Sequence, residues 1–462
     1  MHGGEGDAVV IGGGLAGMLV VRALLGHVRK VTVVERDRYP DGPAFRKGVP
    51  QARHLHILLT GGQEALEELL PGTGAELAAA GARRLDMPRD LLTCGLTGWQ
   101  IRFHEGRHSL ISCTRPLLDH VVRTRVLAAA AASGTAVEVV EATDAVGLLG
   151  GPDRVTGVRV RPRGAGRQER DMDADLVVDA SGRASRTPQW LEALGRAAPA
   201  QESVDPGLQY ASRVLRLPEP PGTGVYVQYR PDNPAAGGLL PLEDGTWILT
   251  VSGIGGLDVP TDEDGFAEFT SGLAHPYLHE LLRGAEPLSP VIGFRDTSNR
   301  RRRYEAPGGV PEGLVVVGDA ACSFNPVYGQ GMTVAAVGAL ALRDALADGG
   351  PRAGLAARAQ RAVARAADAA WLTAVGADRP YVDVGQSSAP GLGERFTSWY
   401  VERLVARAAV DPVVGSAFRD VVALTAPPSR MLAPAVALRT MLLRRRPALA
   451  DPPLGPVPAT RR

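Results

Sequence analysis

The sequence is poor in cysteine, and the few cysteines it has follow no metal-binding or disulfide pattern. Cys94, Cys113 and Cys322 are the only three, and they lie far apart with no CxxC pair. Disulfide-rich secreted domains and structural zinc sites show the opposite, with closely spaced cysteines. We therefore expect no disulfide framework, no metal site and a reducing, cytoplasmic location.

Long hydrophobic runs are also missing. No stretch of 18 apolar residues occurs, and no basic segment followed by an apolar core precedes the strand-like segment 7–11. From these absences we expect that the protein is not secreted and has no membrane span. The apolar and basic segment 431–446 leaves weak association with a membrane surface open, although a docking helix is the favoured interpretation.

The chain lacks an excess of charge of either sign. Its 462 residues include 51 Lys and Arg against 50 Asp and Glu, which gives a formal net charge of +1. Binding to nucleic acid requires a basic face, so no nucleic-acid partner is expected. A content of 45% hydrophobic and 22% charged residues is typical of a globular, enzyme-sized protein. The expected partner is a small molecule, and the sequence predicts no particular oligomeric state.

A glycine pattern near the start of the chain carries the first chemical signal. Gly12, Gly14 and Gly17 form GxGxxG between a strand-like segment and a helix expected over 15–26. The first two glycines allow a tight turn against a pyrophosphate, and the third lets the helix pack closely. Glu35 follows at roughly the 20-residue offset expected for an acid that binds a ribose. The pattern predicts dinucleotide binding without a 2′-phosphate, which Glu35 would repel.

A second glycine loop follows another apolar strand late in the chain. Residues 318–321 read Gly-Asp-Ala-Ala, and residues 325–332 read Asn-Pro-Val-Tyr-Gly-Gln-Gly-Met before a second helix. Asp319 would stand at the carboxyl edge of the sheet, where ligands of open α/β sheets bind. Gly329 and Gly331 would clear side chains from the N-terminus of that helix. One ligand can then contact both loops.

Together these segments resemble the FAD-dependent monooxygenases of the p-hydroxybenzoate hydroxylase and squalene epoxidase type. The resemblance covers most of residues 1 to about 345. Within it, the stretches 46–56, 299–304 and 322–326 resemble the branch of actinobacterial polyether and polyketide epoxidase-like flavoproteins. The family implies FAD as the resident cofactor and NAD(P)H as a transient reductant.

The resemblance also implies which residues hold FAD. Glu35 and Arg36 would bind the adenosine ribose end, Arg115 would support the pyrophosphate side, and Asp319 would bond the ribitol chain. Backbone N–H groups at the start of the second helix would face the flavin pyrimidine edge, where a helix N-terminus stabilises the negative charge of reduced flavin. The full expected cofactor site comprises Gly12, Gly14, Leu15, Ala16, Gly17, Glu35, Arg36, Arg46, Arg115, Asp319, Pro326, Gly329, Gly331 and Met332.

Two positions depart from the family pattern. In the middle motif, residues 179–186, Ser181 replaces an acid, which leaves the use of NAD(P)H open. Cys322 stands where the family often has histidine, so no histidine acid or base is proposed there, and no other catalytic side chain is assigned.

Several further residues have two interpretations. His54 and His56 would point to the same side of an extended segment, and hydrogen bonding beneath the flavin loop is favoured over a metal pair because a third ligand is missing nearby. Three aromatic residues either line a substrate pocket or belong to the core, namely Trp99, Tyr210 and Phe324.

The order of elements predicts an α/β protein with a doubly wound, Rossmann-like FAD-binding domain of the glutathione reductase type. A helix is expected over 66–81, a hairpin from 137–140 and 154–161, and a mostly antiparallel second sheet between 208 and 252. The expected domains are FAD-binding (1–75, 113–190 and 291–345), substrate (76–112 and 191–290), C-terminal helical (346–443) and a flexible tail (444–462).

The predicted activity is insertion of one oxygen atom into a lipophilic polyketide or terpenoid intermediate, such as one in antibiotic biosynthesis, by epoxidation or hydroxylation. The alternative is a non-redox cyclase or isomerase in which FAD is structural and the pocket folds a polyene. A flavin-dependent halogenase is a minor alternative, because neither Lys30 nor Lys47 is well placed and no Trp-x-Trp-x-Ile-Pro segment occurs.

Overall fold

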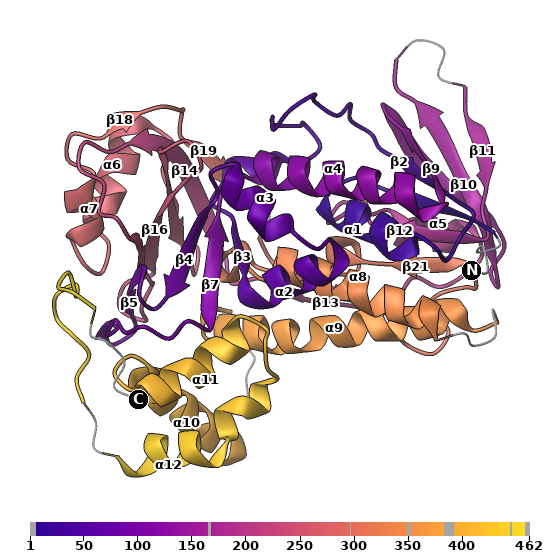
Figure 1. Ribbon diagram of the computed structural model, residues 1–462. Helices are drawn as coiled ribbons and strands as arrows, with labels where there is room; N and C mark the ends of the chain where they lie inside the picture. Colours follow the sequence, from indigo (N-terminus) through magenta and orange to yellow (C-terminus); the bar gives the residue numbers. More distant parts are fainter. Residues whose placement is uncertain are drawn as a thin grey trace.

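The computed structural model describes residues 6–164, 168–295, 297–348, 353–382, 392–443 and 446–457, with the backbone alone for 392–394. Figure 1 shows a parallel sheet with its helices on the right and a large, mostly antiparallel sheet on the left. A helical C-terminal region lies below them. This arrangement confirms the predicted α/β fold with a second sheet and C-terminal helices.

The parallel sheet consists of short, valine-rich strands that are buried on both faces. Ala8 and Val10 face a layer of helices, whereas Val9 and Ile11 pack on the opposite side. Apolar residues on both faces are what a central parallel strand requires. The strand order is β21 (Leu314–Val316), β12 (Leu176–Asp179), β1 (Asp7–Ile11), β2 (Lys30–Val34) and β8 (Ala136–Val140).

Different layers cover the two faces of this sheet. The helical layer consists of α1 (Leu15–Leu24), α4 (Arg115–Ser133) and α8 (Gly331–Ala347), with α9 (Leu355–Asp378) lying along α8. The other face is covered by α5 (Thr187–Ala193) and by a three-stranded sheet of β9 (Thr143–Gly150), β10 (Val155–Pro162) and β11 (Arg170–Asp173).

The register of the parallel strands brings their carboxyl ends to one edge. Ile11 lies opposite Val34 on one side and Asp179 on the other, and Asp179 lies opposite Val316. The chain therefore leaves four neighbouring strands at the same level. Both glycine loops, Glu35 and the middle motif start at this edge, as expected for a ligand site of an open α/β sheet.

The predicted hairpin of 137–140 with 154–161 is wrong. The first segment is β8, which pairs with β2 in the parallel sheet, while β10 pairs with β9. Both segments are short and rich in valine, so their pattern does not distinguish a parallel edge strand from one arm of a hairpin.

The large sheet has one apolar face and one mixed face. Val225 and Val227 point outward into a core shared with α6 (Glu263–Ser271) and α7 (Tyr277–Leu281), whereas Tyr226 between them lies on the inner face. The strands are β18 (Glu286–Pro287), β14 (Gln209–Arg216), β17 (Trp247–Gly253), β16 (Ala235–Pro241), β15 (Gly224–Val227), β5 (Leu91–Gly95) and β6 (Gly98–Trp99), with β19 (Ile292–Phe294) beside β14. Its separate core supports the domain division, which stays a proposal.

The helix expected over 66–81 is two helices. Pro71 and Gly72 interrupt it, because proline disfavours helix in the residue before it and Gly72 adopts a φ of 88°. The segments are α2 (Thr60–Leu69) and α3 (Thr73–Ala79). Two small antiparallel sheets complete the centre, one of β3 (Ile57–Leu59), β7 (His108–Ser112) and β4 (Arg83–Met87), the other of β13 (Gln201–Val204), β20 (Asn299–Arg302) and β22 (Cys322–Ser323).

The C-terminal region packs as helices and then returns to the large sheet. Its helices are α10 (Leu392–Ala408), α11 (Pro412–Val422) and α12 (Pro434–Leu442). A flexible tail is predicted over 444–462, but within its described part Leu449 exchanges two backbone hydrogen bonds with Trp99 of β6, at 2.8 and 3.1 Å. None of the helices in the described ranges is long and apolar enough to cross a bilayer.

The middle motif is folded around a buried carboxylate at the end of β12. Asp179 is fully buried and accepts hydrogen bonds from the Ser181 backbone N–H and from the hydroxyls of Ser181, Ser185 and Thr187, at 2.5–2.9 Å. Ser181, the departure from the family pattern, thus belongs to a closed network that fixes the loop.

Replacing Asp179 by alanine is expected to lower the free energy of unfolding by about 3 kcal/mol, because several hydrogen bonds to a buried charge are lost together. Chemical denaturation followed by tryptophan fluorescence measures the change. Asp171→Ala is the control, since that carboxylate is exposed and forms a surface ion pair with Arg159, and it should have little effect. Equal effects of the two substitutions would contradict this account of the loop.

Candidate active site

The first glycine loop has the close approaches that require glycine. A Cβ on Gly12, whose φ is 92°, would lie 2.8 Å from the Ala180 carbonyl oxygen, and a Cβ on Gly17 would lie 1.9 Å from that of Gly12. Gly14 is different, because no atom lies within 4 Å of where its Cβ would be. The loop thus leaves open space directly before the N-terminus of α1, where backbone N–H groups attract a phosphate.

Glu35 is already part of the wall of this loop. Its buried carboxylate accepts hydrogen bonds from the N–H of Gly13 at 2.7 Å and of Asp37 at 2.8 Å. The Nη1 atom of Arg46 lies 3.4 Å from Glu35 Oε2 and is a buried donor without a well-formed hydrogen bond. Arg36 is exposed at the rim. One end of the site thus contains the acid Glu35, the unsatisfied Nη1 donor of Arg46 and the exposed side chain of Arg36.

The two glycine loops touch each other. Gly318 adopts a φ of 56°, and a Cβ there would lie 3.1 Å from the Cβ of Ala16. The following residue, Asp319, directs its carboxylate toward the start of α8, where a Cβ on Gly331 would lie 3.9 Å from Asp319 Oδ1. The structure therefore places the N-termini of α1 and α8 beside one another, as the two motifs predict.

Three arginines surround the carboxylate of Asp319. Burial raises the pKa of Asp319, while the positive charges of Arg115, Arg183 and Arg300 act in the opposite direction. Arg115 is the first residue of α4 and donates from Nε to Asp119 at 2.6 Å. Arg183 comes from the middle motif and donates to the Ser298 carbonyl and the Ser323 hydroxyl.

A buried carboxylate holds the second loop from behind. Asp378, at the end of α9, is fully buried and accepts hydrogen bonds from the side-chain amides of Asn299 and Asn325 and from the hydroxyl of Tyr328. The Tyr328 hydroxyl also lies 3.3 Å from that of Tyr229, which follows β15 of the large sheet. This network joins α9, the second loop and the large sheet.

The remaining residues expected in the second loop occupy different surroundings. Pro326 is exposed, and Met332 packs in the helical core. A Cβ on Gly329 would lie 2.6 Å from Ile57, so the loop contacts the chain segment 54–57. Leu15, at the start of α1, is buried in the same core as Met332.

Segment 54–57 lies between the second loop and the inner face of the large sheet. The Nδ1 atom of His54 is 2.9 Å from the Ser212 hydroxyl, and a Cβ on Gly238 would lie 3.3 Å from Leu55. Burial, with a smaller effect of Arg53, lowers the pKa of His54 to about 4, so this histidine is neutral. Within the described ranges no group of three or more potential metal ligands occurs near this pair or elsewhere.

Three residues of this region are half-buried, namely His56, Tyr226 and Asp319. They come from segment 54–57, from the inner face of the large sheet and from the second loop.

The three aromatic candidates are not brought together. Tyr210 packs with Tyr229 and Phe294 on the inner face and contacts His54, with ring centroids 4.6 Å apart. Trp99 is fully buried in the outer core, and Phe324 packs against α9. Only Tyr210 adjoins the region described above.

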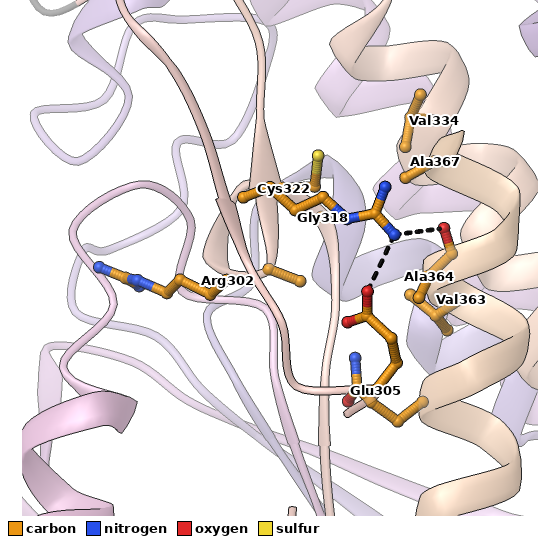
Figure 2. Close-up of a pocket in the computed structure, with 11 residues that line it drawn as sticks. Arg302, Glu305, Gly318, Cys322, Val334, Val363, Ala364 and Ala367 are labelled. Carbon is orange, nitrogen blue, oxygen red and sulfur yellow. Dashed lines mark hydrogen bonds and ion pairs between the residues drawn. The ribbon is translucent and has the colours of Figure 1, made fainter. Parts of the chain in front are cut away.

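Two other hollows do not belong to this site. A cavity of about 20 Å³ behind Gly318 holds the Arg301–Glu305 ion pair, while Arg302 points away from it (Figure 2). Its volume suits about one water molecule. A hollow of about 300 Å³ near Asp7 and Lys30 lies at the amino ends of β1 and β2, opposite the glycine loops.

Sequence reasoning missed two residues of the site. Asp378 was not singled out because its partners come from segments far away in the chain. Tyr226 carried a usable signal, since its alternation with Val225 and Val227 places it on the opposite face of the strand.

Comparison with known proteins identifies the family. Residues 5–371 match the family described as FAD binding domain, which spans both glycine loops and the large sheet. The chain belongs to this family of flavin-dependent monooxygenases. It is a flavoprotein oxidoreductase with FAD as its cofactor, and NAD(P)H is the usual reductant in the family.

Individual relatives agree with this assignment. The chain is 35% identical to protein Rv3254 of Mycobacterium tuberculosis, over 79% of this chain and 78% of that protein. It is 28% identical to kynurenine 3-monooxygenase of Salinispora tropica, over 71% and 69% of the two chains. None of these matches identifies a substrate for this chain.

Solved structures share the fold at low identity. The flavin-dependent brominase Bmp2 superposes with a TM-score of 0.64 at 17% identity, covering 90% of this chain and 93% of the brominase. The Diels-Alderase PyrE3 gives 0.60 at 16% identity, with coverage of 90% and 80%. At this identity the likeness concerns the architecture alone.

The geometry fits the cofactor of the FAD binding domain family. Gly14 leaves room for a pyrophosphate, Arg46 has an unsatisfied donor at the same end, and Asp319 lies half-buried beside the start of α8 at the other end. The site therefore accepts an elongated dinucleotide across both loops.

Gly14→Val is expected to weaken FAD binding by about 100-fold, or about 2.7 kcal/mol, because the new side chain enters the space before α1, where an added Cβ meets no atom within 4 Å. Titration of apoprotein with FAD, followed by flavin fluorescence, measures the dissociation constant. Gly151→Val is the control, since a Cβ there also meets nothing within 4 Å but lies away from the loops. Unchanged FAD affinity in Gly14→Val would show that the pyrophosphate lies elsewhere.

Proposed function

We propose that this protein is a FAD-dependent monooxygenase that epoxidises or hydroxylates a small, lipophilic natural-product intermediate of polyketide or terpenoid type. The observation that carries the proposal is the contact between the two glycine loops at the edge of the parallel sheet. Segment 54–57 connects this region to the inner face of the large sheet, where Tyr210 contacts His54. A cofactor across both loops and a substrate against that face would meet there. Bound FAD, once reduced by NAD(P)H, supplies the oxygen-transfer chemistry.

In this proposal the chain's own residues hold and orient the cofactor. The start of α1 at Gly14 binds the pyrophosphate, and Glu35 with Arg36 and Arg46 binds the adenosine end. Asp319 bonds the ribityl chain, with Arg115 near its carboxylate.

The backbone N–H groups of Gly331 and Met332, at the start of α8, stabilise negative charge on the reduced ring. Tyr210 and the other aromatic residues of the inner face exclude water from the reacting atoms.

A second candidate is a non-redox cyclase that keeps FAD as a structural part. The observation that favours it is the closed network of Ser181 around Asp179, in the motif that the wider family associates with NAD(P)H. The shared fold of PyrE3 shows that this architecture also occurs in a Diels-Alderase. The halogenase stays a minor alternative, supported by the fold of Bmp2 alone.

The proposal places the reaction in the cytoplasm. It assigns no role in the reaction to the C-terminal helices. Exposed apolar side chains of these helices, such as Phe396, Trp399 and Leu442, make this region a candidate contact surface. Weak association with a membrane surface would be assigned to segment 431–446, for which a docking helix is the favoured interpretation.

The proposed function predicts that NADH or NADPH bleaches the flavin absorbance near neutral pH without oxygen, and that reoxidation in air transfers oxygen to an alkene-bearing substrate. Oxygen uptake, NAD(P)H oxidation and product mass test this together. A product heavier by one oxygen atom supports the monooxygenase. Product formation that continues without oxygen and reductant would instead establish the cyclase.

A further inference from the structure

The C-terminal helix α12 is apolar on two sides, although only one of them packs against the protein. Val436 and Thr440 are buried, and Val436 belongs to a core that residues of α10 and α11 complete. On the other side, Leu438 is 59% exposed and Leu442 is 71% exposed. A surface helix normally turns polar side chains outward, and a helix that is apolar all round is normally covered on all sides. The outer side of α12 is therefore a surface that calls for a partner.

The exposed side of α12 continues onto α10 through one arginine. Arg403 donates hydrogen bonds to three backbone carbonyls at the end of α12, at 2.6–3.4 Å. Its Cζ lies 5.8 Å from the ring centroid of the exposed Trp399, and this ring contacts the exposed Phe396. In Figure 1, α12 lies at the outer end of the C-terminal region. We call the exposed residues of this surface the C-terminal apolar patch: Phe396, Trp399, Leu438, Met441, Leu442 and Leu443.

The sequence around the C-terminal apolar patch is basic and contains no acid. Residues 421–450 include five arginines and no aspartate or glutamate, in a chain whose net charge is +1. Two of them, Arg430 and Arg439, pair with buried carboxylates at α11. The other three are consecutive at 444–446 and directly follow the patch, and the described Arg446 is exposed. The patch thus has a basic rim.

The charges on α10 do not change the sign of this rim. Among the described side chains of α10, the exposed acid Glu402 is matched by the exposed Arg395. Arg403 carries a charge with which no carboxylate in the described ranges pairs. An apolar surface with arginines at its rim is complementary to an apolar phase that has anionic groups at its border.

We propose that the C-terminal apolar patch docks on the surface of an anionic lipid bilayer. The leucines enter the boundary of the acyl chains, Trp399 lies at the interface, and the arginines meet the lipid phosphates. The cytoplasmic leaflet is the anionic one, which suits the location expected for this protein. A second copy of the chain fits less well, because a twofold contact brings the same arginines face to face. Nucleic acid would match the arginines but not the exposed leucines.

Vesicle binding by the FAD-loaded full chain tests the proposal. Vesicles of phosphatidylcholine alone are compared, by sedimentation at low and high salt, with vesicles of equimolar phosphatidylcholine and phosphatidylglycerol. We expect binding to the anionic vesicles, about tenfold weaker binding to the neutral ones, and a smaller difference at high salt, because salt screens the attraction between arginine and phosphate.

Tryptophan emission reports whether the patch itself enters the lipid. Trp99, Trp190, Trp247 and Trp371 are buried, whereas Trp399 is 41% exposed. Anionic vesicles should therefore shift the emission to shorter wavelength as Trp399 leaves water. Trp399→Phe should abolish this shift and keep most of the binding.

Two variants separate the apolar and the basic contributions. Leu442→Ser should weaken binding to anionic vesicles about tenfold, and the combined variant Arg444→Gln, Arg445→Gln and Arg446→Gln about 100-fold. Leu127→Ser is the control, since this exposed leucine lies on α4, which Figure 1 shows across the molecule from α12. FAD content and thermal unfolding of each variant report whether the fold is intact.

Three results would overturn the proposal. They are equal binding to neutral and anionic vesicles, an emission shift that Trp399→Phe leaves in place, and absence of binding to anionic vesicles. In the last case, a dimer that Leu442→Ser dissociates would identify a second copy of the chain as the cover of the patch. Because these measurements need no turnover, a failure of the proposed oxygen transfer would leave this surface assignment unaffected.

Discussion

The close contact between the two glycine loops is the constraint on which the rest of the site depends. A Cβ on Gly318 would make a tight contact of 3.1 Å with the Cβ of Ala16, and a Cβ on Gly17 would clash with the carbonyl of Gly12 at 1.9 Å. Both loops leave the same edge of the parallel sheet, because the register aligns the carboxyl ends of β1, β12 and β21. Two helix N-termini therefore lie side by side, and their N–H groups and dipoles favour a ligand with two phosphates and a flavin that becomes negative on reduction.

The second requirement is a fixed distance between this edge and the large sheet. Asp378 meets it by bonding residues from β20, the second loop and η3 (Pro326–Tyr328), and the Tyr328–Tyr229 contact extends the network to the sheet. Segment 54–57 fills the gap from the other side, through His54 and Leu55. A buried carboxylate without these donors would be strongly unfavourable, so the network specifies one arrangement of the two parts.

Local patterns predicted much of the fold, and long-range pairing explains most of what they missed. The glycine loops, the strands before them and the helix at Arg115 follow from short-range signals such as GxGxxG and proline at N1, and the structure contains them. The partner of segment 137–140 was wrong because a valine-rich strand suits either sheet. The Ala-Ala-Gly-Gly start of β16 lacks the alternation of a half-buried strand, so its pairing with β15 and β17 defines this strand within the predicted sheet.

The candidate site shows the same division. The positions of Glu35, Asp319 and Gly331 follow from their motifs. Trp99 and Phe324 instead belong to other cores, and no local sequence pattern reveals this.

The measurement that tests the account most directly is a crystal structure of the FAD-loaded protein. The account predicts the pyrophosphate before Gly14 and the flavin ring between the start of α8 and the inner face that carries Tyr226. A flavin ring bound away from Gly331, or FAD held by only one of the two loops, would contradict it.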